Sequence, residues 1–201
     1  MTKFKVTKEE ADRLMKEKGN IRGSLLKSSF LVIFDEKGPE GIKKIEQKME
    51  KLGYPLNLKE ISSFKWYPYG YSSLALLLMM ESFDWEEKNI FEMGYKVPSY
   101  SILAKLLMKY ISPERLFTDG FKYWRKHFDF SDLKCAKLDE KRKLAHLRID
   151  NFKKFHPLDN ILIKGSLTRI IEMVTKSKSV KVEQTKNIFE NDPFNEFKIT
   201  W

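Results

Sequence analysis

Cysteine is almost absent from this chain, because only Cys135 among its 201 residues carries a thiol. A single cysteine excludes an internal disulfide framework and any metal site built from several thiolates, and it fits a reducing compartment. Long apolar runs are absent too: the longest, residues 74–80, has seven residues, whereas a membrane helix needs about 20. No basic and apolar leader with a small-residue cleavage site opens the sequence. We therefore expect no membrane segment and a cytoplasmic protein.

Catalytic and metal-binding motifs are also missing. The sequence has no glycine-rich phosphate loop, no nucleophile elbow and no close acidic pair in an apolar setting, so it supports no enzyme class and no catalytic residue. The three histidines, His127, His146 and His156, are too far apart for a helical metal pair, and we expect no metal site. His146 is predicted to be a hydrogen-bonded structural residue, and Cys135 a buried, inert thiol.

The most apolar stretch, residues 63–83, is predicted to form the centre of the core. Its middle, residues 74–80, would make a helix that is apolar on every face, and such a helix is buried. Five aromatic residues lead into it: Phe64, Trp66, Tyr67, Tyr69 and Tyr71. From composition alone these rings either line a cavity or close the end of the core.

Helix signals fill the first two thirds of the chain. Thr7 caps a first helix that Gly19 ends, and Pro39 begins an amphipathic helix that Gly53 ends. Asp84 is the expected cap of a later helix. Besides the central one, the predicted helices cover residues 7–19, 23–34, 39–53, 84–94, 99–110 and 112–128, with a break at 35–39.

After Asp129 the apolar period changes from helical to alternating. Residues 133–138 and 144–150 predict two antiparallel strands, residues 159–174 a helix, and residues 180–182 and 196–201 two further strands. The expected fold class is α+β: a helical part followed by a four-stranded, mostly antiparallel sheet in the order strand, strand, helix, strand, strand. We expect a single domain, 1–201, made of a lead-in helix (1–19), a helical part (20–130) and a sheet part (131–201).

The net charge of +10 is partly local, because residues 121–154 hold eleven basic against five acidic residues. Such a stretch is either an ordinary solvated surface or an anion-binding one. The second interpretation leaves a nucleic-acid-binding protein as an alternative function, with affinity for duplex DNA that falls steeply with salt.

In the order of its elements and several segments, the chain resembles the superfamily of haem nitric oxide/oxygen-binding (H-NOX) and vinyl-reductase-type ligand-binding domains. The segments are IRGSLLKSSFLVIFDEKGPEGIKKIEQKM at the start, the central WYP before an apolar helix, ISPERLF, FKYWRKHFDF, and the terminal FKITW. The resemblance covers residues 20–201. It implies a helical front half and a four-stranded sheet that enclose a pocket for a small ligand.

The best-known members of that superfamily hold haem, and the resemblance places Phe121 at their iron-binding histidine. Phenylalanine cannot ligate iron, and His127, six residues on, points well away from the Phe121 face of a helix. Where these members bind the haem propionates with a Tyr-x-Ser-x-Arg pattern, this chain has Leu147, Arg148, Ile149, Asp150 and Asn151. We therefore expect no haem and no other cofactor.

Vinyl-reductase-type relatives carry cysteines near the C-terminus, where this chain has Asn187 and Asn195, so that metal site is also expected to be absent. What remains is a pocket, predicted to be lined by Trp66, Tyr67, Phe121, Trp124 and Leu147 and suited to an apolar or aromatic ligand. The expected function is a non-catalytic ligand-binding or sensory domain. Its expected partners are a second copy of the chain, in a homodimer, and a separate signalling protein.

Overall fold

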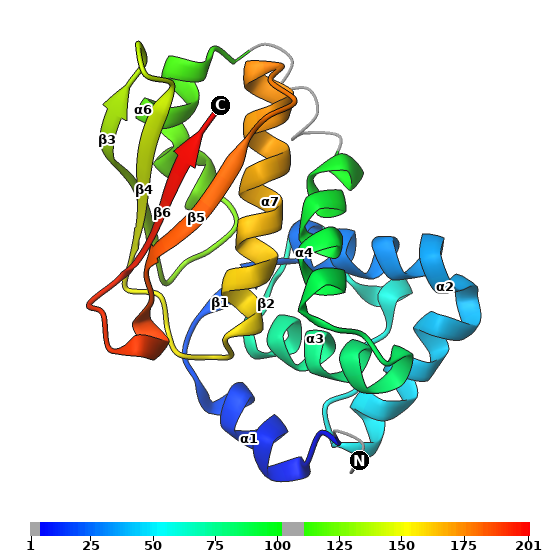
Figure 1. Ribbon diagram of the computed structural model, residues 1–201. Helices are drawn as coiled ribbons and strands as arrows, with labels where there is room; N and C mark the ends of the chain where they lie inside the picture. The colour runs from blue at the N-terminus through cyan, green and yellow to red at the C-terminus, as the bar shows by residue number, and fades with distance from the viewer. Residues whose placement is uncertain (1–4, 102–110) are drawn as a thin grey trace.

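The computed structural model describes residues 5–101 and 111–201, and the side chain of Phe121 lies outside the described part. An antiparallel sheet forms one side of the molecule, and the long helix α7 runs between this sheet and the helices α3 and α4 (Figure 1). The sheet has the order β3-β4-β6-β5. The bounds are β3 Asp132–Asp139, β4 Leu144–Asp150, α7 Leu158–Thr175, β5 Lys181–Lys186 and β6 Asn195–Thr200. The predicted α+β class and the order strand, strand, helix, strand, strand are confirmed.

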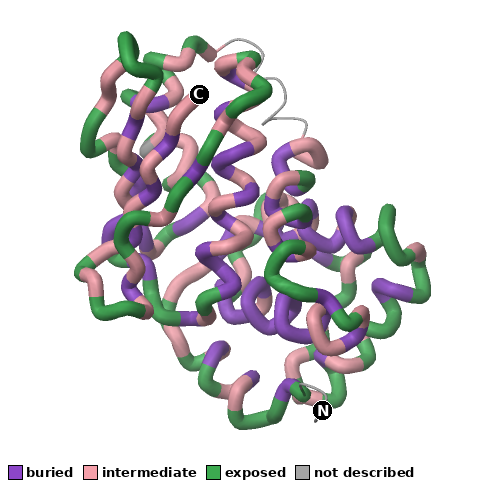
Figure 2. The backbone as a smooth tube through the Cα atoms, viewed as in Figure 1, coloured by how far each residue is buried: buried purple, intermediate pink, exposed green. Residues whose placement is uncertain are grey.

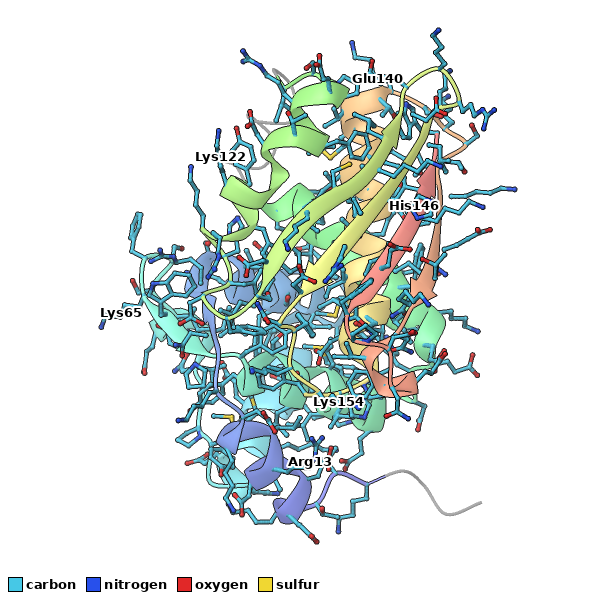
Figure 3. All side chains as sticks on the ribbon, turned by 90° about the vertical axis from the view of Figure 1, so that its left-hand side faces the viewer. Arg13, Lys65, Lys122, Glu140, His146 and Lys154 are labelled. Atoms are coloured by element: carbon cyan, nitrogen blue, oxygen red, sulfur yellow. The ribbon has the colours of Figure 1, made fainter. Side chains whose placement is uncertain are left out.

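The sheet is apolar on the face toward α6 and α7 and polar on the other face. In β4, Leu147 and Ile149 are buried, whereas the alternate residues His146 and Arg148 lie on the outer face. His146 is turned toward the viewer in Figure 3. The Nδ1 atom of His146 is 3.2 Å from Oε1 of Glu196 on the neighbouring β6, so His146 is hydrogen-bonded as predicted. Strict alternation in β4 fixes the register, because a slip of one residue would expose the apolar set.

The helical part occupies the first two thirds of the chain as expected. Its elements are α1 Lys8–Lys16, α2 Gly23–Lys51, α3 Gly70–Phe83, α4 Glu87–Lys96 and α6 Pro113–Trp124, with short 3₁₀ turns at Leu58–Glu60, Val97–Tyr100 and, after β5, Ile188–Glu190. The helix predicted over residues 99–110 falls largely on residues 102–110, which lie outside the described residues.

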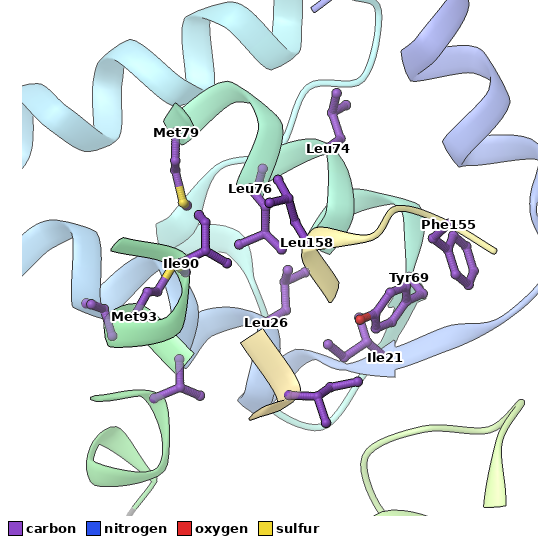
Figure 4. Packing of buried hydrophobic residues seen from close by; sticks show 14 of the residues in the cluster. Ile21, Leu26, Tyr69, Leu74, Leu76, Met79, Ile90, Met93, Phe155 and Leu158 are labelled. Atoms are coloured by element: carbon purple, nitrogen blue, oxygen red, sulfur yellow. The ribbon is translucent and has the colours of Figure 1, made fainter. Parts of the chain in front are cut away.

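Helix α3 is buried almost all round, as its sequence predicts (Figure 2). Leu74 and Met79 have no exposed surface, and the four residues between them are at most 2% exposed. Figure 4 shows Leu74, Leu76 and Met79 among residues of other elements, including Leu158 of α7 and Ile90 of α4. Among the described helices none has both the length and the apolar character that a membrane span requires.

Several helix ends differ from the prediction. Helix α1 ends at Lys16 and not at Gly19. Instead of stopping before residue 35, the α2 helix continues to a kink at Gly38, whose φ of 65° and ψ of −171° only glycine adopts easily. Asp84 does not begin α4: it has φ 52° and ends α3, while Glu86 caps α4 through a capping box with Asn89. The α6 helix stops at Trp124, four residues early.

A two-stranded ribbon was not predicted. Strand β1 (Asn20–Arg22) pairs antiparallel with β2 (Trp66–Pro68), which lies among the aromatic residues that precede α3. Each strand has three residues, too few for an alternating pattern, and β2 ends in proline. The ribbon continues toward the sheet part, because Ile21 bridges to Phe128 after α6.

Candidate functional site

A cavity of about 230 Å³ lies between α6, α7, the inner face of the sheet and the start of α2. Its wall is overwhelmingly apolar. Helix α7 contributes one side of it with Leu162, Ile163, Leu167 and Ile171. Small-molecule sites are mostly apolar hollows of this kind, with few polar groups.

Of the five residues predicted to line the pocket, Trp124 and Leu147 lie in the wall of this cavity. Gly120 lies in it as well, but the side chain of the adjacent Phe121 is outside the described part of the chain. Trp66 and Tyr67 are placed elsewhere, because the pairing of β2 with β1 holds them at the surface ribbon.

Trp66 and Tyr67 have contacts of their own. The guanidinium of Arg22 lies over the Trp66 ring, 4.0 Å from its centre, and Trp66 is 38% exposed. The Tyr67 hydroxyl accepts a hydrogen bond of 2.9 Å from the backbone N–H of Ser62. Both rings therefore stabilise the ribbon.

Trp124 is held firmly in the cavity wall. Its indole N–H donates to the hydroxyl of Ser131 at 2.9 Å, and its ring lies 4.4 Å from that of Phe128, centre to centre. A buried indole usually needs such a partner for its N–H. The ring therefore faces the cavity in a fixed orientation.

A packed group of aromatic rings closes one end of the core beside the cavity. Tyr69 sits at its centre and contacts Phe128, Phe130, Phe152 and Phe155, with ring centres 4.7 to 5.9 Å apart. Tyr69 and Phe128 also line the cavity. The two interpretations left open for the aromatic residues before α3 thus both apply to Tyr69.

Behind Tyr69 lies a buried carboxyl group, Asp159 at the start of α7. It accepts hydrogen bonds from the hydroxyls of Tyr69 (3.2 Å) and Ser73 (2.9 Å) and from the backbone N–H of His156 (3.0 Å). Burial raises the pKa of Asp159 to about 7, although these hydrogen bonds act against the rise. No motif in the sequence distinguishes Asp159 from the other acidic residues.

The polar groups of the cavity wall that carry or can carry charge are few. Lys126 and His127 follow α6 and were not predicted to line a pocket, while Cys135 and Lys134 come from β3. Cys135 is half-buried, and burial raises the pKa of its thiol, in agreement with an unreactive group. No aspartate or glutamate is among the described residues that form the wall.

The positions that the resemblance assigns to propionate binding carry no free cation toward the cavity. Leu147 and Ile149 are apolar, and Asn151 donates to a carboxylate oxygen of Asp132 at 3.3 Å. Arg148 lies on the outer face, where it pairs with Asp150 and covers the ring of Phe194 at 3.6 Å.

The two asparagines that the resemblance places at the relatives' cysteines both hydrogen-bond to Asn160 of α7. Asn195 donates to the side-chain carbonyl of Asn160 at 2.9 Å, and Asn160 donates to that of Asn187 at 3.1 Å. The backbone N–H of Ile188 also donates to the side-chain oxygen of Asn195 at 3.0 Å. This amide cluster joins α7 to β6 by hydrogen bonds, which gives the positions a structural role.

The basic stretch 121–154 is partly neutralised in the fold. Arg125 pairs with Asp132 at 2.7 Å, and Lys134 and Arg148 share Asp150. Lys122, labelled in Figure 3, pairs with Asp119 at 2.9 Å. These pairs make the stretch less positive than its residue count indicates. Over the described residues, no group of three or more His, Cys, Asp or Glu side chains is arranged to hold a metal ion.

The fold belongs to a known structural class. No family profile matches the sequence, and no curated protein is similar to it in sequence. Solved structures nevertheless match it over nearly its whole described extent, and several of them are H-NOX proteins. The chain has an H-NOX-like fold.

Two of the matching structures illustrate the similarity. An H-NOX protein from S. oneidensis in the Fe(II)NO ligation state is superimposed with a TM-score of 0.65 and 10% identity, over 89% of this chain and 98% of that one. The unliganded Fe(II) H-NOX protein from K. algicida gives a TM-score of 0.62 and 14% identity, over 90% and 96% of the two chains. At such identities the likeness shows the fold alone.

Proposed function

We propose that this chain is a non-catalytic ligand-binding domain of the H-NOX type that binds a small apolar or aromatic molecule in place of haem and signals to a separate protein. The cavity of about 230 Å³ with its apolar wall carries the proposal. Its position between α6, α7 and the sheet gives a ligand contact with both halves of the fold. A molecule bound there can therefore change how the two halves sit against each other.

In our proposal, the residues of the cavity wall are not suited to binding the iron or the propionates of haem. The resemblance places Phe121 at the family's histidine, and Leu147, Ile149 and Asn151 at its propionate motif. His127 is the one imidazole in the described wall. Its backbone N–H donates to the carbonyl of Trp124 and its carbonyl accepts from the backbone N–H of Arg22, at 2.9 Å each, which fixes the backbone of His127 in the turn after α6.

The first test is incubation of the purified protein with hemin. We expect no sharp ligand-field absorption band and no stoichiometric uptake. A sharp band with one haem per chain would overturn the proposal.

The second test measures binding of 1-octanol by isothermal titration calorimetry. Leu167→Phe places extra side-chain volume in the cavity wall and is expected to weaken binding at least tenfold. Leu56→Phe, a half-buried position outside the wall, is the matched control and should leave affinity unchanged. Equal affinity in all three proteins would show that octanol binds elsewhere and would contradict the proposal.

A further inference from the structure

One edge of the cavity, at the end of α6 and in the turn that follows it, carries several ionisable side chains. Tyr123, Lys126 and His127 all line the cavity there. The ammonium group of Lys126 lies 5.4 Å from the centre of the Tyr123 ring, and Lys126 is exposed to solvent. Within the described part of the chain it makes no ion pair with a carboxylate. A cation therefore stands at the rim of an apolar space without a counter-charge.

His127 adds an unused polar atom to the same edge. Its Nδ1 is buried and has no hydrogen-bond partner among the described residues. Leaving such an atom unpaired costs free energy, so it marks a place where a partner is expected. Burial lowers the pKa of His127, and the positive charges of Arg22 and Lys126 lower it further. The edge thus combines a neutral imidazole with a positive potential.

The remaining described residues of the cavity wall offer no negative charge. Lys134 touches the wall, but its ammonium group turns to the outer face and pairs with Asp150. Asp129, close in sequence to His127, is outside the wall and accepts two hydrogen bonds of 2.6 Å from Asn20. An anion at the Lys126 edge would therefore meet attraction without repulsion from the wall.

The volume limits the size of the molecule. An apolar protein cavity of about 150 Å³ takes one benzene molecule. In proportion, the cavity of about 230 Å³ takes a molecule of roughly ten non-hydrogen atoms. Octanoic acid and phenylacetic acid both have this size.

We propose that the ligand is a small carboxylic acid whose carboxylate binds at Lys126 and His127 and whose apolar part fills the space between α6 and α7. The inference rests on the proposed function and names the chemistry of its ligand. The carboxylate accepts a hydrogen bond from the imidazole of His127 and forms an ion pair with the ammonium group of Lys126. Such charge-assisted contacts are the stronger kind of hydrogen bond.

The test compares three probes with the same eight-carbon chain by isothermal titration calorimetry: octanoic acid, 1-octanol and octylamine. We expect octanoate to bind about tenfold more tightly than 1-octanol, and octylamine to bind most weakly, because one extra charge-assisted contact changes affinity by about that factor. Raising the salt concentration should weaken the binding of octanoate alone.

The Lys126→Gln variant separates the charge from the cavity. Lys126 is exposed, so the fold should be unaffected, and octanoate should lose about five- to tenfold in affinity while 1-octanol is unchanged. Lys137→Gln, an exposed lysine of β3 outside the wall, is the matched control and should change neither affinity. In NMR titrations, octanoate should raise the pKa of His127, and 1-octanol should not.

Two results would overturn the inference in different ways. If octanoate and 1-octanol bind equally and Lys126→Gln has no effect, the acidic group plays no part, but the apolar site stands. If none of the three probes binds, the proposed function fails together with the inference.

Discussion

The two sides of α7 show opposite kinds of packing. Toward α4 the helices touch backbone to backbone: a Cβ atom on Gly94 would lie 2.1 Å from the carbonyl oxygen of Leu162, and one on Gly165 would lie 2.1 Å from that of Phe91. The hydroxyl of Ser166 donates to the carbonyl of Gly94 at 2.9 Å across the same contact. The two glycines thus allow the backbones of α4 and α7 to pack in direct contact.

Toward α6 the same helix leaves a hollow. A Cβ atom on Gly120 of α6 would meet only the end of the Leu133 side chain, at 3.7 Å. Leu167 and Ile171 face the cavity, although they are as apolar as any residue of the packed core. Apolar side chains alone therefore do not ensure tight packing between two helices, because the size of the residues at the contact sets the helix spacing. An unfilled apolar space costs stability, and a ligand that fills it returns that stability.

The largest effect we expect comes from Asp159, the buried carboxyl group at the closed end of α7. Because its folded-state pKa of about 7 lies above the ordinary value of 3.8, the protonated folded form is favoured. The contribution of Asp159 to the free energy of unfolding is fully present below pH 3.8 and is lost as the pH rises toward 7. At about 1.4 kcal/mol per pH unit, the loss is roughly 4 kcal/mol.

Urea unfolding between pH 4 and 8 measures this loss. Asp159→Asn keeps the shape of the side chain and removes its ionisation, so the difference between the two stability curves should rise steadily up to pH 7 and then level off. The difference between the two curves is needed because burial also lowers the pKa of His156. Below pH 6.5 this shift makes stability rise with pH, opposite to the effect of Asp159. Parallel curves for the two proteins would show that Asp159 has an ordinary pKa.

The second-largest effect is expected from matched glycine substitutions on the two sides of α7. Gly165→Ala forces α4 and α7 apart and should destabilise the protein by about 2 to 3 kcal/mol. Gly120→Ala, on the hollow side, meets no such obstacle and should stabilise α6 by about 0.5 to 1 kcal/mol. Chemical denaturation of both variants checks the prediction. Equal effects would mean that the two sides of α7 are packed alike.

Alternation and end signals in the sequence were enough to predict most of the fold. The runs in β4 and β6 put every second residue inside, and the apolar α3 predicts its own burial. Asp84 was misassigned because a helix cap and a left-handed helix end both favour aspartate. The ribbon of β1 and β2 was missed because three-residue strands have no period to detect.

The cavity was harder to predict from the sequence. Trp124 and Leu147 came from the family resemblance, since nothing in their neighbourhood distinguishes a residue beside a void from one in a solid core. Lys126 and His127 were overlooked as wall residues because the helix was expected to run through them. The role of Gly94 and Gly165 depends on which helices touch, and a single sequence does not carry that information.

The smallest effect concerns added volume on the two sides of the core. Ile90 of α4 is fully buried on the closed side, so Ile90→Phe should cost about 1 to 3 kcal/mol by overpacking. Leu167→Phe adds a ring where space exists, and the new contacts offset most of the strain, so the change should stay below about 1 kcal/mol in either direction. Thermal and urea unfolding of the two variants provide the measurement. If Leu167→Phe destabilises as strongly as Ile90→Phe, the space beside α7 cannot accept a ring, and the cavity could not receive a ligand without a larger rearrangement of α6.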